Sequence, residues 1–144
     1  ADVLYAPALL STLVSKTDKS VVPYDTGFEP GDEPVKLCLR NSKAVDFGKS
    51  IRRSYETAGE WPGFMRLAPA AALYVANKLD QQVRAGAIDT PCEDSFRSMI
   101  LAAHSDEIEF RDVTGIPWIE IDFPEDIKRA QKIIAPQIKM PSGV

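Results

Sequence analysis

The sequence lacks long apolar runs and clusters of basic residues, and both absences narrow the range of functions. No hydrophobic segment approaches the roughly 18 residues of a membrane-spanning helix, and no charged segment followed by an apolar stretch marks a secretory signal. The formal net charge is −4, and no basic cluster exceeds a pair such as Arg52-Arg53. Such a charge balance disfavours binding to nucleic acids or anionic membranes. We therefore expect a cytoplasmic protein that binds neither membranes nor nucleic acids.

Cysteine and histidine are also scarce. The two cysteines, Cys38 and Cys92, lie far apart without the spacing of metal ligands, so we expect both to be reduced packing residues. The single histidine, His104, has no serine, cysteine or metal-cluster partner in the sequence, and we expect it to interact with the dipole at a helix end. Neither residue type specifies a catalytic chemistry.

Length and composition predict one globular domain. The chain has 144 residues, of which 44% are hydrophobic and 26% are charged, enough for a sizeable core. Its hydrophobic patterns alternate between strands and helices, which predicts an α/β fold with a mixed, largely parallel sheet flanked by helices. The predicted strands are 21–24, 35–39, 44–47, 64–67 and 108–113, and the predicted helices begin at Pro7, Pro69 and Pro91.

Two local patterns refine this expectation. The segment Asn41-Ser42-Lys43 separates two of the strands at a spacing typical of a hairpin, so residues 35–47 should form a small antiparallel insertion. Thr90-Pro91-Cys92-Glu93 has the pattern of a capping box that opens the third helix.

The segment from Trp118 to Ala130 is the most informative in the chain. Its first residues are aromatic or β-branched, it then presents carboxylates, and Pro124 suits the first position of a helix. Glu125 and Asp126 complement the positive end of that helix, whereas Phe123 cannot accept hydrogen bonds as an N-cap. The pattern predicts a strand that ends on carboxylates and runs into a helix with a weak start.

The pattern W-x-E-I-D-x-P-E-D-x-x-R-A resembles the C-terminal segment of nucleotidyltransferases, above all their phosphocholine and 2-aminoethylphosphonate cytidylyltransferase branch. Three shorter motifs lie upstream, in the order of that family, namely Gly48-Lys49-Ser50-Ile51, Gly59-Glu60-Trp61-Pro62-Gly63-Phe64 and Glu93-Asp94. The resemblance covers nearly the whole chain. It implies a partial Rossmann-like fold and Mg²⁺-dependent transfer of a nucleotidyl group, CMP from CTP, to a phosphorylated small molecule such as phosphocholine, with release of pyrophosphate.

The resemblance also assigns the reacting residues. Asp122, the last carboxylate of the motif, would bind the catalytic Mg²⁺, and Asp2 would be the second ligand. Lys49 would contact substrate phosphate, and Asp94 would face the active-site cleft. The simpler alternatives are an ordinary acid near a helix start for Asp122 and a solvated surface lysine for Lys49.

Two tryptophans lie next to acids, at Glu60-Trp61 and at Trp118-Ile119-Glu120. Carboxylates beside aromatic faces suit a quaternary ammonium or aminoethyl group, because each cation–π contact is worth roughly 0.5 to 2 kcal/mol. These four side chains are therefore candidate substrate-binding residues. The alternative is that the two tryptophans simply pack in the core.

One family feature is missing from the sequence. The related enzymes carry a glycine-rich L-A-A-G-x-G-x-R loop that cradles the triphosphate, whereas the eight glycines of this chain are scattered. We therefore expect residues 1–135 to be the C-terminal two-thirds of a nucleotidyltransferase domain, followed by a loose tail over 136–144, with an N-terminal companion segment or chain completing the site. The alternatives are a non-catalytic subunit that packs on a nucleotide-binding chain, or a sugar-1-phosphate nucleotidyltransferase. The sequence leaves the acceptor, the base preference and the oligomeric state open.

Overall fold

A computed structural model describes residues 2–14, 16–29, 31–103 and 107–138. His104 and residues 139–144 of the expected tail lie outside this description. The elements are β1 (Val3–Tyr5), α1 (Pro7–Leu13), β2 (Ser20–Tyr24), β3 (Lys36–Arg40), β4 (Lys43–Gly48), β5 (Thr57–Glu60), α2 (Pro69–Arg84), α3 (Glu93–Ala102), β6 (Ile108–Asp112), β7 (Trp118–Glu120) and α4 (Pro124–Arg129). A π-helical turn (Ala130–Ile134) and a 3₁₀ turn (Ala135–Gln137) continue α4. No helix in these described ranges is long and apolar enough to cross a membrane.

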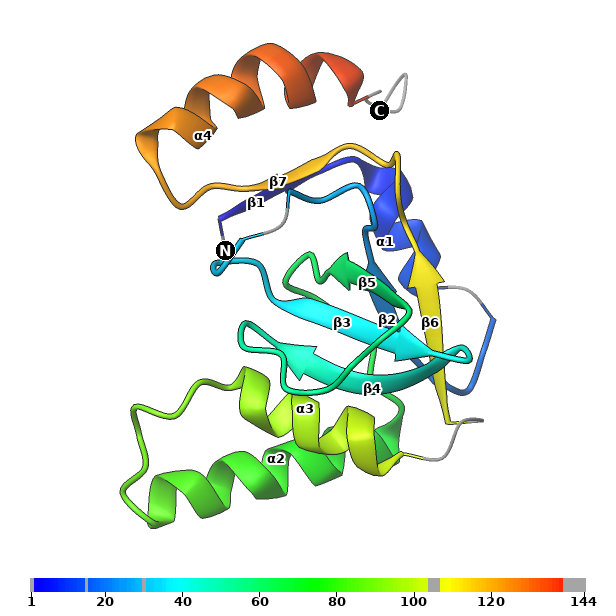
Figure 1. Ribbon diagram of the computed structural model, residues 1–144, viewed down its shortest axis with the longest axis vertical. Coiled ribbons are helices and arrows are strands. Elements are labelled where there is room, and N and C mark those ends of the chain that lie inside the picture. Colours follow the sequence, from blue (N-terminus) through cyan, green and yellow to red (C-terminus); the bar gives the residue numbers. More distant parts are fainter. Residues whose placement is uncertain (1, 15, 30, 104–106, 139–144) are drawn as a thin grey trace.

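The strands lie between two helical layers (Figure 1). The β1–β7 pair, which is antiparallel, is covered by α4 and its extension, while α2 and α3 pack below the antiparallel β4-β3-β5 sheet. β2 and β6 pair in parallel. The predicted mixed α/β architecture is thus confirmed. The expectation that most strand pairs are parallel is wrong, because β5 and the predicted insertion both add antiparallel pairs.

The insertion itself forms as the sequence predicts. β3 and β4 are joined through Asn41 and Ser42, whose φ angles of 49° and 60° match the twist of a tight hairpin. Strand β5 was not predicted, because its sequence Thr-Ala-Gly-Glu has almost no β-branched or aromatic residue. The predicted strand over 64–67 contributes only a single bridge, between Arg66 and Val21.

Two smaller expectations are also wrong. Helix α3 begins without any side-chain cap, so the capping box at Thr90 does not form. Cys38 is buried in β3 as expected, but Cys92 is exposed before α3 and does not pack in the core.

A main core lies between the strands and the α2–α3 layer, and a smaller one lies under α4. Phe47, Leu37, Val22, Trp61 and Met99 are central to the first. In the second, Ile119 packs with Ala130 and Ile134, and Ile138 adds partial cover. The smaller cluster holds the β1–β7 pair against the C-terminal helix.

Asp46 connects the two sides of the main core. Its side chain is 0% exposed, and its carboxylate accepts hydrogen bonds from the backbone N–H groups of Phe47, Arg52 and Arg53 and from the guanidinium of Arg97, 2.8 Å away. Burial opposes its ionisation, but these hydrogen bonds, the one from Arg52 foremost, lower the pKa of Asp46. One buried charge thereby fixes both the segment after β4 and the position of α3.

We predict that Asp46→Asn lowers the free energy of unfolding by roughly 3 kcal/mol, because it leaves Arg97 facing a neutral group in a partly buried pair. Urea unfolding of the purified protein measures it. Asp80→Asn is the matched control, since Asp80 pairs with Arg84 at 2.7 Å on the exposed face of α2. The control should lose only about 0.3 to 0.5 kcal/mol. Equal losses in the two variants would contradict the anchoring role of Asp46.

Candidate active site

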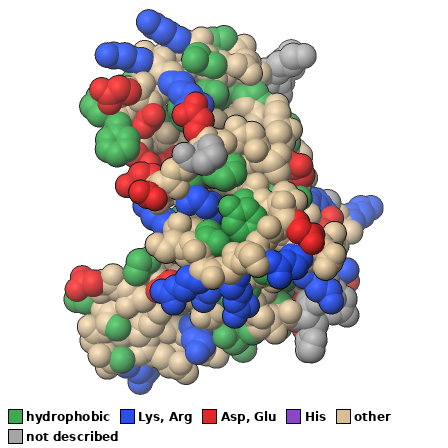
Figure 2. Space-filling model, viewed as in Figure 1, with side chains coloured by type: hydrophobic (Ala, Val, Ile, Leu, Met, Phe, Trp, Pro, Cys, Tyr) green, Lys and Arg blue, Asp and Glu red, His purple; other side chains and the backbone are tan. Residues whose placement is uncertain are grey.

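A cleft of about 580 Å³ opens between the β1–β7 pair with α4 and the sheet that carries β3 and β5. Acidic side chains gather beside the hollow below α4 (Figure 2). Six of the eight predicted site residues line it, namely Lys49, Glu60, Trp61, Trp118, Glu120 and Asp122. Three segments far apart in the sequence thus meet at one cavity.

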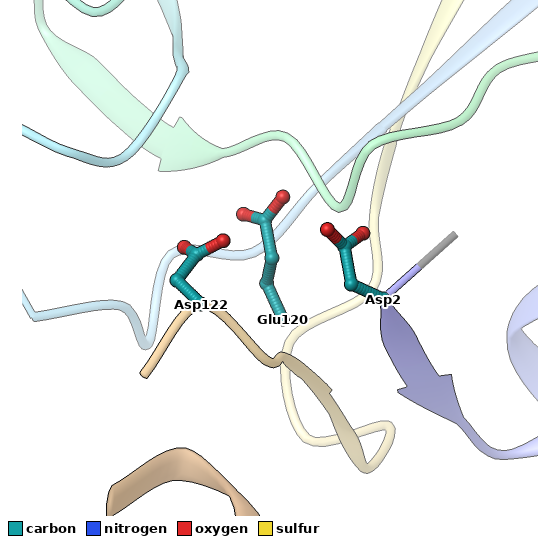
Figure 3. A group of neighbouring side chains, drawn as sticks. All are labelled: Asp2, Glu120 and Asp122. Atoms are coloured by element: carbon teal, nitrogen blue, oxygen red, sulfur yellow. The ribbon is translucent and has the colours of Figure 1, made fainter. Parts of the chain in front are cut away.

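Three carboxylates converge at one end of the cleft. Asp2, Glu120 and Asp122 each place a carboxylate oxygen within 4.8 Å of the others, and all three residues are exposed (Figure 3). The β1–β7 register causes this convergence, because Val3 lies opposite Glu120 and the Asp2 carbonyl accepts a hydrogen bond from the Ile121 N–H. The structure therefore brings the two predicted metal ligands together and adds Glu120, which the sequence indicated only for substrate binding.

The start of α4, directly after Asp122, is stabilised by a side chain from the first turn of the helix itself. The Asp126 carboxylate accepts hydrogen bonds from the backbone N–H groups of Phe123, at 2.9 Å, and Asp122, at 3.2 Å. Asp126 thus turns the chain at the point where Phe123 cannot. The predicted weak start of α4 is compensated, and Asp122 has an ordered backbone.

Glu60 is the half-buried acid of the cleft. Burial raises its pKa to about 7, and repulsion from Glu120 and Asp25 adds to this rise, against attraction to Arg129 and Lys36. The pKa of Glu120 is also raised, first by burial and then by Asp122 and Asp2. In both acids burial is the larger cause and neighbouring carboxylates add to it, so each holds its proton more tightly than it would in water.

The two tryptophans have different environments. Trp61 is only 9% exposed, its ring packs edge-on against Phe47, and its Nε1–H donates to the Phe64 carbonyl. It is a core residue that reaches the cleft with one side. Trp118 is half-buried, and its Nε1–H donates to a carboxylate oxygen of Asp25 at 2.8 Å. Trp118 is thus the better candidate for a cleft wall.

Lys49 is held at the cleft by two contacts. Its ammonium group pairs with Glu33 at 2.8 Å, which raises the pKa of Lys49 and lowers that of Glu33. Its backbone carbonyl accepts a hydrogen bond from the Lys36 ammonium. Glu33 and Lys49 are both largely exposed, so an anionic ligand could replace Glu33 at little cost.

Asp94 does not line the cleft. It is exposed on α3, and its carbonyl accepts a hydrogen bond from Ser98, while the preceding residue, Glu93, lines the cavity instead. Sequence reasoning also missed Asp25, Phe28 and Arg129, which line the cleft. The acid directly after the predicted strand 21–24 was the one signal that could have identified Asp25.

Neither a protein-family model nor a curated protein matches the sequence. Among solved structures, the fold is similar to that of the inositol-1-phosphate CTP transferase from T. maritima, with a TM-score of 0.57 and 15% sequence identity. The similarity covers 87% of this chain and 48% of that protein, so the chain spans about half its length. At this identity the likeness shows the fold: the chain has a nucleotidyltransferase-like α/β architecture.

The raised pKa of Glu60 predicts a specific pH dependence. The folded protein holds this proton more tightly than the unfolded chain, so stability falls as the pH rises from about 4.5 towards about 7 and stays lower above it. Glu60→Gln removes this effect and should gain about 1 to 2 kcal/mol relative to the parent at pH 8 compared with pH 5, after allowance for solvent screening. Urea unfolding at the two pH values measures the difference.

The control is Glu125→Gln, which alters an exposed acid in the first turn of α4. Its effect on stability should be the same at both pH values. A Glu60→Gln variant with no pH-dependent gain would show that the Glu60 carboxylate is not destabilised in the folded protein.

Proposed function

We propose that this chain provides the metal- and acceptor-binding part of a Mg²⁺-dependent cytidylyltransferase that transfers CMP from CTP to a small phosphate or phosphonate with a cationic head group, such as phosphocholine. One observation carries this proposal: the carboxylates of Asp2, Glu120 and Asp122 converge at one end of a cleft whose walls hold Glu60 and Trp118. Nucleotidyl transfer would use the three carboxylates to hold the metal, and a cationic acceptor would use the walls at Glu60 and Trp118.

The three carboxylates fit Mg²⁺ by their chemistry. They are hard oxygen ligands, they lie within 4.8 Å of one another, and their exposure leaves room for water and substrate phosphate, which this ion keeps in its coordination shell. When bound, the metal would neutralise charge that develops on the phosphoryl oxygens. Asp2 and Asp122 are the proposed primary ligands, and Glu120 would be the third carboxylate of the cluster.

The remaining residues would orient the acceptor. The Lys49 ammonium, released from Glu33, would bind the acceptor phosphate, and Glu60 and Trp118 would enclose its cationic head group. A cation beside Glu60 favours the ionised carboxylate and so offsets the destabilisation described above. In the reaction, an acceptor phosphate oxygen forms a bond to the α-phosphorus of CTP while the bond to the β-phosphate breaks and pyrophosphate leaves.

The donors to the triphosphate would come from a companion segment or chain. The sequence contains no glycine-rich loop, and the carboxylates of the cleft repel phosphate. In the extreme form of this arrangement, the chain would be a subunit that has no catalytic activity of its own and packs on a nucleotide-binding chain.

A neutral polyol phosphate is the second candidate acceptor. The structural neighbour is by name a transferase of inositol-1-phosphate, and a sugar-1-phosphate acceptor belongs to the same chemical class. The acidic and aromatic walls favour the cationic acceptor, because they would gain charge attraction and cation–π contact from it but only hydrogen bonds and packing from an uncharged ring of hydroxyl groups.

Calorimetric titration of the chain tests the acceptor. Phosphocholine should bind more tightly than inositol 1-phosphate. Trp118→Leu should lower the affinity for phosphocholine by roughly five- to thirty-fold, because the cation–π contact is lost. Trp61→Leu is the contrasting variant: Trp61 lies in the core, so this change should lower the unfolding free energy more than the affinity. CTP with Mg²⁺ should bind only in the millimolar range.

Two results would contradict these proposals. Tighter binding of inositol 1-phosphate than of phosphocholine would contradict the proposal of a cationic acceptor. Micromolar binding of CTP would contradict the proposal that a companion segment is needed.

The metal site is tested without turnover. Mn²⁺, a paramagnetic substitute for Mg²⁺, should broaden the backbone NMR signals around Asp2 and Ile121, and Asp122→Asn should raise the Mn²⁺ concentration required by roughly tenfold or more, because the amide loses the charge that the cation needs. Asp94→Asn removes an exposed acid outside the cleft and should leave the titration unchanged. Broadening that is insensitive to Asp122→Asn would exclude this residue from the metal site.

A further inference from the structure

Asp25, the residue after β2, uses both carboxylate oxygens at the cleft. Oδ1 accepts the Gly27 N–H at 2.8 Å, which closes a tight turn, and Oδ2 accepts the Trp118 indole N–H at 2.8 Å. These two partners lie on opposite sides of Asp25 in the fold, one in the loop after β2 and the other in β7. The carboxylate therefore links the cleft loop to the strand that leads to Glu120.

The backbone of Asp25 is held as firmly as its side chain. Its N–H donates to the Glu60 carbonyl at 2.9 Å, and its carbonyl accepts the Glu60 N–H at 2.8 Å. This crossing is close: a Cβ atom at Gly59 would lie 2.6 Å from Cδ2 of Tyr24 and 3.0 Å from the carbonyl oxygen of Asp25. Only glycine at position 59 allows β5 to pass this near. The carboxylate is consequently presented to Trp118 from a fixed point.

Trp118 needs such an anchor. Its ring is half-buried at the cleft, and β7 is only three residues long. An indole has two rotatable side-chain bonds, and a hydrogen bond from its N–H to a carboxylate fixes the face that it turns to the cavity. Without that hydrogen bond to the carboxylate, only packing on one side of the ring would hold it.

We propose that Asp25 is a positioning residue: it fixes the indole of Trp118 as a wall of the cleft and thereby makes the cleft select a cationic acceptor over a neutral one of equal shape. The selectivity rests on the proposed function, whereas the orientation of the indole is a property of the chain alone.

Asp25→Asn and Asp112→Asn form a matched pair. Asn at 25 keeps the shape but offers one accepting oxygen and no charge, so it can accept only one of the two N–H groups, and only through a weaker hydrogen bond. Asp112 ends the neighbouring strand β6 and accepts the Thr114 N–H at 2.9 Å in the same kind of turn, without contact to Trp118. The control thus removes an identical charge from an equivalent turn.

The first measurement follows the indole N–H signals by NMR, with Trp118→Phe as the assignment standard. Trp61, whose N–H donates to the Phe64 carbonyl at 2.9 Å, is an internal reference. In Asp25→Asn the Trp118 indole proton should exchange with solvent roughly tenfold faster, because a hydrogen bond to a charged group is lost. The Trp61 signal should not change, and Asp112→Asn should affect neither signal. An unchanged Trp118 signal in Asp25→Asn overturns the proposal.

The second measurement compares binding of phosphocholine with that of 3,3-dimethylbutyl phosphate, its uncharged isostere. Asp25→Asn should reduce the preference for phosphocholine by roughly fivefold, and the same substitution in a Trp118→Phe background should reduce it little further, because the anchored N–H is already absent. An equal loss in both backgrounds would show that Asp25 acts directly through its charge and would overturn the positioning role. If the parent binds neither phosphate, the proposed acceptor and the selectivity both fail, while the indole signals still decide whether Asp25 holds Trp118.

Discussion

Mutual repulsion among the carboxylates of one cleft is the constraint on which the rest of this structure depends. Burial and neighbouring charges raise the pKa of both Glu60 and Glu120, and Asp2 and Asp122 lie close to the latter. A fold selected only for stability would separate these groups or pair each with a basic residue. The chain instead keeps them together, an arrangement that supports the proposal that ligands supply further positive charge in the cleft. The proposed divalent cation and the proposed cationic acceptor would supply that charge at the two ends of the cleft.

The scaffold tolerates this repulsion because two carboxylates outside the three-acid cluster anchor the neighbouring segments. Asp46, buried behind the cleft, orders the segment that follows Lys49 and ties it to α3 through Arg97. On the opposite side, Asp126 holds the backbone of Asp122 and Phe123. Both anchors are carboxylates whose oxygens accept backbone N–H groups, and these hydrogen bonds stabilise their negative charge. The acids of the cleft can therefore remain weakly paired without loosening the cavity.

The sequence predicts those parts of the site that depend on local pattern. The strand over Trp118–Glu120 and the helix from Pro124 follow from side-chain type and Pro placement, and Lys49 and Glu60 come from short motifs on neighbouring segments. The sequence fails where a contact crosses the fold. Asp94 was chosen over Glu93 because the helix was expected to open with a capping box, and an error of one residue on a helix turns a side chain by about 100°. Asp25 was missed because its partner, Trp118, is 93 residues away.

The strand β7 explains why the metal site and the acceptor wall occur together. Alternate residues of a strand share a face, so Trp118 and Glu120 both line the cleft while the Ile119 side chain packs against the π-helical turn that continues α4, and Asp122 continues the series beyond the strand end. Each step of two residues advances about 6.6 Å. One short strand thus places Trp118 one such step from Glu120 and two steps, roughly 13 Å, from Asp122, a proposed metal ligand. The proposed acceptor, a phosphate joined to a cationic group by a two-carbon spacer, would lie along this series with its anionic end towards the proposed metal site and its cationic end at Trp118. The spacing of β7, as much as its chemistry, therefore favours a compact acceptor over an extended one.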